Sequence, residues 1–322
     1  MVRMVESLQL LKWGSRFSLW ARAATAGVAG AALAMPAWAL SGGAGAAELA
    51  LDSPWTGVGS LNVNGQLFSA TLIAPGYVLT AAHVAAGAAL SSIRFQTNGG
   101  TSFASGASAI YVNPGYTGAT TGNLAGDPSV HADLAIIRLS EAAPLSVPVY
   151  SVFGGSLSGR TLSLVSYGGS ATLATTGANR VDKVFADTQG AAQTYLFDFD
   201  GPDLSTNRIG ANTLANGTLG AGVEASLVSG DSGSAAFVYA NGAWQLAGVN
   251  TFQVNFPAGP SSAGSFGTGG GGVTLASQNA WIQSVVLAPV PEPETGWMLL
   301  TGLAMLGSLR KTRASRMRRH RA

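Results

Sequence analysis

The chain contains no cysteine. This absence excludes disulfide bonds, thiolate metal ligands and a cysteine nucleophile. Histidine is also scarce: of the three residues, His320 lies in the C-terminal tail, and only His83 and His131 lie in the central region. The segment His131-Ala132-Asp133 is too sparse for a zinc site. The sequence therefore predicts neither a bound metal nor a cofactor.

Charged side chains make up only 10% of the residues, whereas glycine contributes 44 residues and hydrophobic residues reach 47%. A disordered chain would combine low hydrophobicity with high charge, so this composition indicates a folded protein, and its many glycines favour an all-β fold with many turns. The net charge of +2 arises at the two ends, because residues 40–290 hold six Lys and Arg against twelve Asp and Glu. A nucleic-acid-binding protein would carry basic residues in its folded body, and we therefore expect no nucleic-acid partner.

Residues 1–39 have the layout of a secretory signal peptide. Basic side chains extend to Arg22, an uncharged run follows from Ala23, and the run closes on the pattern Ala37-Trp38-Ala39. We expect signal peptidase to cleave after Ala39. The alternative is a membrane anchor, which the short core of small residues argues against, because a span needs ~20 strongly apolar residues.

Residues 290–322 have three parts. The motif Pro291-Glu292-Pro293 is followed by fifteen uncharged residues, 295–309, and then by a basic tail. This arrangement resembles the PEP-CTERM sorting signal of Gram-negative bacteria, which implies transient membrane association and removal by an exosortase-type enzyme. A plain C-terminal anchor is the alternative, although fifteen residues are few for an independent span. We expect export through the inner membrane, with the central region at the cell surface or outside the cell.

The central region, residues 40–289, contains short apolar runs separated by turn signals such as Asn64-Gly65 and Asn241-Gly242. Many short strands at this spacing predict a sandwich or barrels, and a midpoint near residues 142–148 divides the region into halves 40–145 and 146–289. The Gly-, Ser- and Pro-rich stretch 256–272 is predicted to be a surface loop, and residues 275–286 a helix with one apolar face. The predicted strands are Gln66–Ile73, Tyr77–Thr80, Ile93–Gln96, Ala109–Val112, Leu134–Leu139, Val147–Val152, Leu162–Tyr167, Tyr195–Phe199, Ala235–Tyr239 and Trp244–Val249.

Three residues are candidates for catalysis. His83 ends a β-type run, Asp133 opens another, and Ser232 lies in a bend between two glycines. Imidazole is the usual general base at neutral pH, a partly buried acid can orient it, and a hydroxyl beside backbone N–H donors can attack a carbonyl. Each residue taken singly also has a structural explanation, as a packed histidine, a strand cap or an ordinary turn.

The three segments together resemble those of the chymotrypsin/trypsin-like serine proteases. The order His, Asp, Ser and the intervals of 50 and 99 residues suit that family, and the resemblance covers about residues 55–287. The segments that carry it are Thr80-Ala81-Ala82-His83, Asp133-Leu134-Ala135-Ile136 and Gly230-Asp231-Ser232-Gly233.

This resemblance implies an all-β fold of two antiparallel β-barrels of the chymotrypsin-like type, with a short C-terminal helix and the triad in the cleft between the barrels. It implies a serine endopeptidase that hydrolyses protein or peptide substrates through an acyl-enzyme. Ser232 would be the nucleophile, His83 the general base and Asp133 the acid that orients it. The backbone N–H groups of Gly230 and Ser232 would form the oxyanion hole.

The chain departs from the family at its activation site. In the family, cleavage after a basic residue creates an α-amine that pairs with the acid before the nucleophile, here Asp231. No Lys or Arg occurs between Arg22 and Arg94, so trypsin-like cleavage at the start of the central region is excluded. The expected routes to an active form are signal removal alone or trimming by another protease.

The residues that correspond to the family's specificity pocket are Ser226, Thr251, Phe252 and Gln253. A neutral Ser226 at the base of this pocket does not favour Lys or Arg in the substrate. Gln253, which stands in place of a glycine on the pocket wall, narrows the pocket. The resemblance thus implies a preference for small or apolar side chains. Thr251 keeps a hydroxyl that is expected to support Asp133.

Two other functions remain open on the sequence. One is a binding protein that kept the protease fold and lost its activity, which the missing activation site favours. The other is an esterase using the same triad, although the bend lacks the G-x-S-x-G elbow. The acidic pair Asp198 and Asp200 is most simply a solvated strand end, with weak Ca²⁺ binding left open.

Overall fold

The computed structural model describes residues 9–11, 39–118, 127–169, 172–209, 218–220 and 222–288. The chain divides into two units, Met1–Val286 and Leu287–Ala322, and all the helices and strands given below lie in the first. Within the described ranges, no helix is both long enough and apolar enough to cross a membrane. The predicted sorting motif and the apolar segment 295–309 lie outside those ranges, as does most of the signal region.

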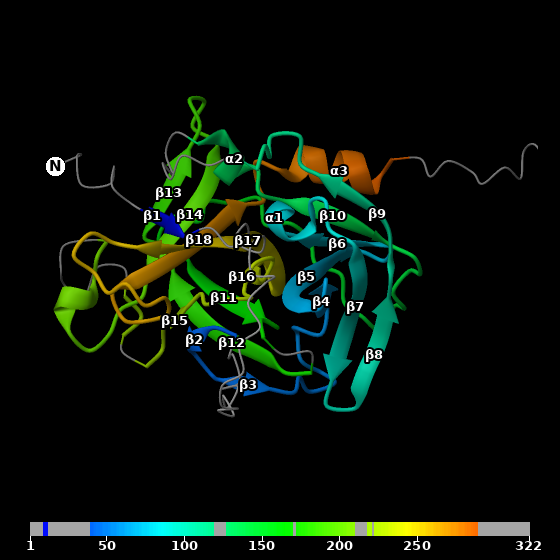
Figure 1. The fold of residues 1–322 in the computed structure, drawn as a ribbon, viewed down its shortest axis with the longest axis horizontal. Helices are drawn as coiled ribbons and strands as arrows, with labels where there is room; N and C mark the ends of the chain where they lie inside the picture. The colour runs from blue at the N-terminus through cyan, green and yellow to red at the C-terminus, as the bar shows by residue number, and fades with distance from the viewer. Residues whose placement is uncertain are drawn as a thin grey trace, which may run out of the picture. The chain divides into compact units, whose positions relative to one another are not determined.

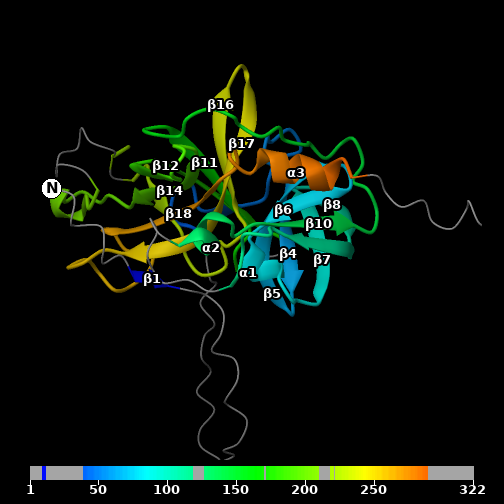
Figure 2. The ribbon, with the colours of Figure 1, turned by 90° about the horizontal axis from the view of Figure 1, so that it is seen from above.

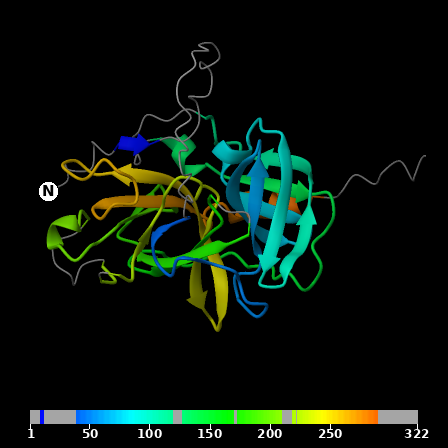
Figure 3. The same ribbon diagram turned by 60° about the horizontal axis from the view of Figure 1, so that its bottom comes forward.

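Seven strands between residues 58 and 139 form the first sheet, in the order β8-β7-β4-β5-β6-β10-β9 with every pair antiparallel. Figure 3 shows them as one strongly curved layer, in colours that run from blue through cyan to the green of β10. Leu61, Leu72, Val78, Phe95 and Ile137 form its buried core, because apolar side chains at these strand positions face inward. The strands are β4 (Val58–Val63), β5 (Gln66–Ala74), β6 (Tyr77–Thr80), β7 (Leu90–Thr97), β8 (Gly100–Ser105), β9 (Ala107–Val112) and β10 (Ala135–Leu139).

The second sheet has nine strands, in the order β13-β14-β18-β17-β16-β11-β12-β3, with β1 beside β17. It lies next to the first sheet (Figure 1). A separate two-stranded sheet joins β15 to β2, so residues 41–47 near the N-terminus pair with strands from the second half of the chain. The strands are β1 (Gln9–Leu11), β2 (Ser41–Gly42), β3 (Ala46–Ala47), β11 (Thr161–Ser166), β12 (Ala174–Arg180), β13 (Lys183–Ala186), β14 (Ala192–Asp198), β15 (Ala225–Ser226), β16 (Ala235–Ala240), β17 (Ala243–Asn255) and β18 (Thr268–Thr274).

A shared hydrophobic cluster joins the two sheets. Leu79 and Ile136 of the first sheet and Phe237 and Val249 of the second belong to it, together with Ile282 of the C-terminal helix. Burial of such side chains stabilises the contact by about 25 cal/mol per Å² of apolar surface. In Figures 1 and 2 the short helix α1 lies on the side of the first sheet that faces the second. The helices are α1 (Ala82–Ala85), α2 (Pro128–His131), the 3₁₀ turn η1 (Leu204–Thr206) and α3 (Asn279–Val286).

The all-β prediction and the short C-terminal helix are confirmed, although α3 begins four residues later than predicted. Both Asn-Gly signals form tight hairpin turns: φ is +52° at Asn64 and +83° at Gly65, and +54° at Asn241 and +79° at Gly242. These positive values are those of the turn that matches the twist of a β-hairpin.

Two predictions were wrong. Residues 268–272 belong to the buried strand β18 and not to a surface loop. Its glycines pack where no side chain fits, since a Cβ on Gly271 would meet the Tyr195 carbonyl oxygen at 2.2 Å. The expected strand Val147–Val152 makes only an isolated bridge at Val152, because Pro148 has no N–H for a ladder.

Candidate active site

His83 lies on α1, a single helical turn that follows β6 after one residue. The alanines around it make this placement possible: Ala82 and Ala85 are buried and pack against Ala135 at the start of β10. Small side chains let the turn approach the strand closely. The imidazole therefore lies beside Asp133, which comes just before β10.

Asp133 binds His83 twice. One carboxylate oxygen accepts the backbone N–H of His83 at 2.9 Å, and the other lies 2.7 Å from His83 Nδ1. The two side chains are only 15% and 13% exposed, for His83 and Asp133 respectively, so water screens this contact weakly. An acid in this position holds the proton on Nδ1 and leaves Nε2 as an acceptor.

Ser232 completes a hydrogen-bonded chain. Its Oγ lies 2.8 Å from His83 Nε2, which is within the range for proton transfer. The bend that carries it, between β15 and β16, is fixed by bonds from Gly233 N–H to the Asn250 carbonyl and from Ser234 N–H to the Asp231 carbonyl, both at 2.9 Å. The structure thus brings together the three residues that the sequence singled out.

The bend also supplies unused donors. Asp231, Gly233 and Ser234 donate their N–H groups to carbonyl oxygens, whereas those of Gly230 and Ser232 donate to no acceptor in the described part of the chain. Gly230 has φ +97°, a conformation that glycine adopts without strain. Backbone donors left free beside a nucleophile can stabilise the charge of an oxyanion.

Asp231 is buried beneath the bend, at 1% exposure. Its carboxylate accepts the N–H of Val228 at 2.6 Å, the hydroxyl of Ser166 at 2.7 Å, and the N–H of Leu40 at 3.2 and 3.3 Å to its two oxygens. Burial raises the pKa of Asp231 to about 7, although the bonds from Ser166, Val228 and Leu40 act in the opposite direction. None of these partners carries a positive charge, so the acid is held by neutral donors alone.

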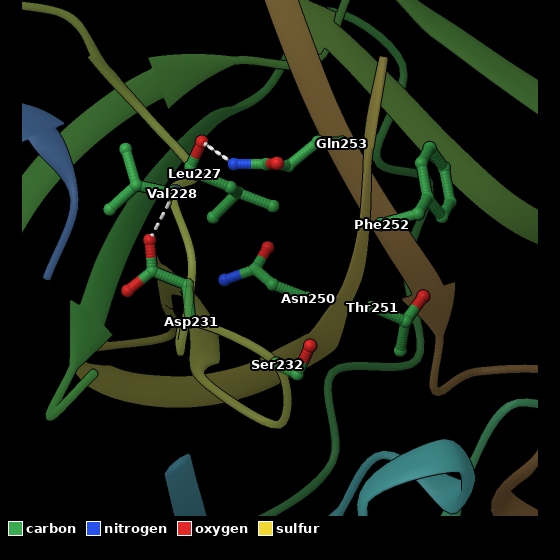
Figure 4. A pocket seen from close by; sticks show the side chains of 8 residues that line it. All are labelled: Leu227, Val228, Asp231, Ser232, Asn250, Thr251, Phe252 and Gln253. Atoms are coloured by element: carbon green, nitrogen blue, oxygen red, sulfur yellow. Dashed lines mark hydrogen bonds between the residues drawn. The ribbon is translucent and has the colours of Figure 1, made fainter. Parts of the chain in front are cut away.

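A small pocket adjoins Ser232 on the side of the second sheet. Figure 4 shows the Gln253 side chain crossing it, and its amide nitrogen donates to the Leu227 carbonyl. Leu227, Phe252 and Gln253 line the walls, and the cavity that remains is about 10 Å³. A single water molecule needs about that much space, so Gln253 closes the pocket to larger groups.

The other predicted pocket residues are placed differently. Ser226 is fully buried on β15 and does not line the cavity. Thr251 lines the cavity, but its hydroxyl makes no hydrogen bond to Asp133 or to any other described residue. The expected support of Asp133 by Thr251 is therefore not seen.

The acidic pair Asp198 and Asp200 is not a solvated strand end, since each is 1% exposed. Both lie near Glu224, which is buried too, and Asp198 also lies near Asp182. Burial raises the pKa of Asp182 to about 9 and that of Asp200 to about 7, and the neighbouring carboxylates reinforce both shifts. Among the described residues, no group of three His, Cys, Asp or Glu side chains has the arrangement of a metal site.

The sequence of residues 43–266 matches the family model Trypsin. The chain belongs to the trypsin family. Among solved structures, the trypsin-family chain is similar to a Glu endopeptidase, with 19% sequence identity, a TM-score of 0.50, and coverage of 76% of this chain and 97% of that one. No curated protein matches the sequence. The family assignment makes the protein a serine protease, and the structural likeness confirms the chymotrypsin-like fold.

Sequence reasoning missed two residues of this trypsin-family site. On the sequence, Leu40 is only the residue after the expected signal cleavage site, and Ser166 is only part of a predicted strand. The Ser166 hydroxyl also lies 3.3 Å from that of Ser69, which in turn accepts the N–H of Tyr167 at 2.8 Å. No local signal singled out Ser166, because the same strand also contains Thr161 and Ser163.

Proposed function

We propose that this trypsin-family protein is an exported serine endopeptidase, with Ser232 as nucleophile, His83 as general base and acid, and Asp133 as the acid that orients His83. The observation that carries the proposal is the continuous hydrogen-bonded chain from Asp133 through His83 to Ser232, with contacts of 2.7 and 2.8 Å.

The chemistry follows from the positions of the protons. Nδ1 of His83 donates its hydrogen bond to Asp133, so Nε2 takes the proton of the Ser232 hydroxyl as Oγ attacks the substrate carbonyl. The N–H groups of Gly230 and Ser232 stabilise the oxyanion, each by about 3–4 kcal/mol of barrier. His83 then passes its proton to the leaving amine, and water releases the acyl group from Ser232 by the reverse sequence.

The residue on the acyl side of the cleaved bond is small. A cavity of about 10 Å³ leaves no room for a long or aromatic side chain while Gln253 spans the pocket. No basic residue lines it and its acid, Asp231, is already bonded to three donors, which disfavours both acidic and basic substrates. Glycine, alanine and serine fit best.

Signal removal is itself the activation step. Cleavage after Ala39 turns the Leu40 amide into an α-ammonium group at the place where its nitrogen already faces both oxygens of Asp231. The cation supplies the charge that this buried carboxylate lacks in the uncleaved chain. The ion pair steadies the bend that carries Gly230 and Ser232.

Signal peptidase and an exosortase-type enzyme are the processing partners in this proposal, acting after Ala39 and near Pro291-Glu292-Pro293. The support is the sequence pattern at each end. The protease would associate with the membrane through its C-terminal segment until that segment is removed, and would then act at the cell surface or outside the cell.

The test uses residues 40–289 with a free Leu40 amine, beside its Ser232→Ala variant. Both are exposed to a fluorophosphonate probe and to casein. Labelling and casein cleavage by the parent alone support the proposal. Folded parent that is not labelled indicates a silent binding protein, and labelled parent that hydrolyses esters but no peptide indicates an esterase.

A further inference from the structure

A second and much larger cavity adjoins His83. Its volume is about 710 Å³, within the range of ligand pockets. The apolar part of its lining comes from Val63, Phe68, Val84 and Ala88, all from the first sheet, α1 and the chain that follows it. It shares no lining residue with the small pocket beside Gln253.

The position of this cavity relative to the scissile bond follows from the role of His83. The leaving amine must receive its proton from His83 Nε2, so the residue after the cleaved bond lies beside that ring. The acyl half is held on the other side, by the pocket of Asn250, Thr251 and Gln253 that adjoins Ser232. None of those β17 residues lines the large cavity, which is bounded instead by Ser229 next to the oxyanion donor Gly230.

The cavity continues along the leaving side. A neighbouring hollow of about 330 Å³ shares Gln66, Phe68 and Ser229 with it and reaches Gly169 and Gly230. Two adjoining hollows lined by both polar and apolar residues suit a peptide that continues past the bond. Their combined size contrasts with the closed acyl-side pocket.

We propose that the selectivity of this protease is set on the leaving-group side, where the cavity of Val63, Phe68, Val84 and Ala88 binds a large aliphatic or aromatic side chain directly after the cleaved bond. The inference rests on the proposed function and names its substrate class: peptides with a small residue before the bond and a large apolar residue after it. The apolar lining favours such a side chain, because each buried CH₂ contributes ~0.8 kcal/mol.

Cleavage of a peptide library by residues 40–289, read by mass spectrometry against the Ser232→Ala variant, tests this. A single apolar group in a fitted pocket changes rates by about 10–200-fold, so peptides with Leu, Met or Phe after the bond should exceed matched Gly peptides at least about 10-fold in kcat/KM. Ser232-dependent cleavage that is indifferent to this residue overturns the inference and leaves the proposed function standing. No labelling and no cleavage overturns both.

Variants on the two sides separate the pockets. Ala86→Trp, at an exposed position that lines the cavity, should fill it and lower the preference for large residues after the bond, whereas Phe68→Ala should extend the preference to larger ones. Gln253→Gly should allow larger substrate residues before the cleaved bond and leave the preference after the bond unchanged. Leu145→Ala, at a 98% exposed position, should change neither preference. Fluorophosphonate labelling confirms that each variant is folded and active. If the probe does not label Ala86→Trp, the test rests on Phe68→Ala alone. An unchanged preference for the residue after the bond in Phe68→Ala would contradict the proposal that the cavity binds that residue.

Discussion

The backbone N–H of Leu40 points at the carboxylate of Asp231, with distances of 3.2 and 3.3 Å to the two oxygens, although the residues are 191 positions apart in sequence. Leu40 is the first residue after the expected signal cleavage site, and Asp231 precedes the candidate nucleophile. A single peptide-bond cleavage would therefore change the charge opposite a buried acid in the active-site bend. Under the proposed function, removal of the signal segment would therefore also complete the active site.

The first prediction concerns this contact. A chain that begins at Leu40 should react with the fluorophosphonate probe at least about 10-fold faster than one that begins at Ala39, because an unpaired buried charge costs about 3–5 kcal/mol. Only the shorter chain has an ammonium group at the position of the Leu40 nitrogen. The rates of labelling, measured on two proteins that differ by one residue, check this.

The control for this pair is Asp231→Asn, which removes the negative partner. In that background the two N-termini should react at equal rates, provided that circular dichroism shows both variant chains to be folded. A rate difference between the two N-termini that persists in the Asp231→Asn background would assign the effect to something other than the ion pair.

The second prediction concerns Asp133, the acid of the proposed triad. Asp133→Asn should lower kcat by about 10⁴-fold, because an amide favours the wrong tautomer of His83. Asp203→Asn is the matched control: Asp203 is exposed and caps the turn η1 through Ser205, so its loss should leave kcat unchanged. Hydrolysis of an activated ester by both variants gives the comparison. Equal rates would remove Asp133 from the catalytic machinery.

The sequence located the candidate triad because each of its residues lies beside a recognisable strand or bend, and the strands were found where apolar residues alternate or run together. It did not locate β18, whose Gly269–Gly272 run reads as a flexible loop but packs between Tyr195 and Val249. It also did not reveal the bonds of Asp231 to Leu40 and Ser166. Contacts over 191 and 65 positions depend on how the strands pair, and no local pattern encodes that.

The third prediction concerns pH and the carboxylate cluster of Asp182, Asp198, Asp200 and Glu224. The folded-state pKa is about 9 for Asp182 and about 7 for Asp200, against 3.8 for an ordinary Asp. Between pH 3.8 and about 9, these two side chains hold more protons in the folded protein than in the unfolded chain. The free energy of unfolding therefore falls as the pH rises through this range. Thermal unfolding of the Ser232→Ala variant should therefore show a higher midpoint near pH 5 than near pH 9.

Asp200→Asn tests the source of this dependence. It removes one charge from the cluster, and one oxygen of Asp200 is buried without a partner among the described residues, so the loss of stability with rising pH should be smaller than in the parent. A midpoint that rises with pH, or a slope unaffected by Asp200→Asn, would contradict this interpretation of the cluster.

The last prediction compares two glycines with nearly equal backbone angles, φ +82° at Gly233 and +79° at Gly242. An alanine in this conformation costs about 1–2 kcal/mol at either site. At Gly242 a Cβ meets nothing within 4 Å, whereas at Gly233 it would lie 2.2 Å from the Thr80 hydroxyl and 2.3 Å from the Ser69 carbonyl, which are bonded to each other at 2.8 Å. Breaking that buried bond costs about 1–3 kcal/mol more.

Urea unfolding should therefore show a larger loss of stability for Gly233→Ala than for Gly242→Ala. Probe labelling should fall only in Gly233→Ala, because the clash pushes on the residue next to Ser232. Equal losses in the two variants would mean that the bend moves away from β5 and β6 at little cost, and that the first sheet does not hold the nucleophile in place.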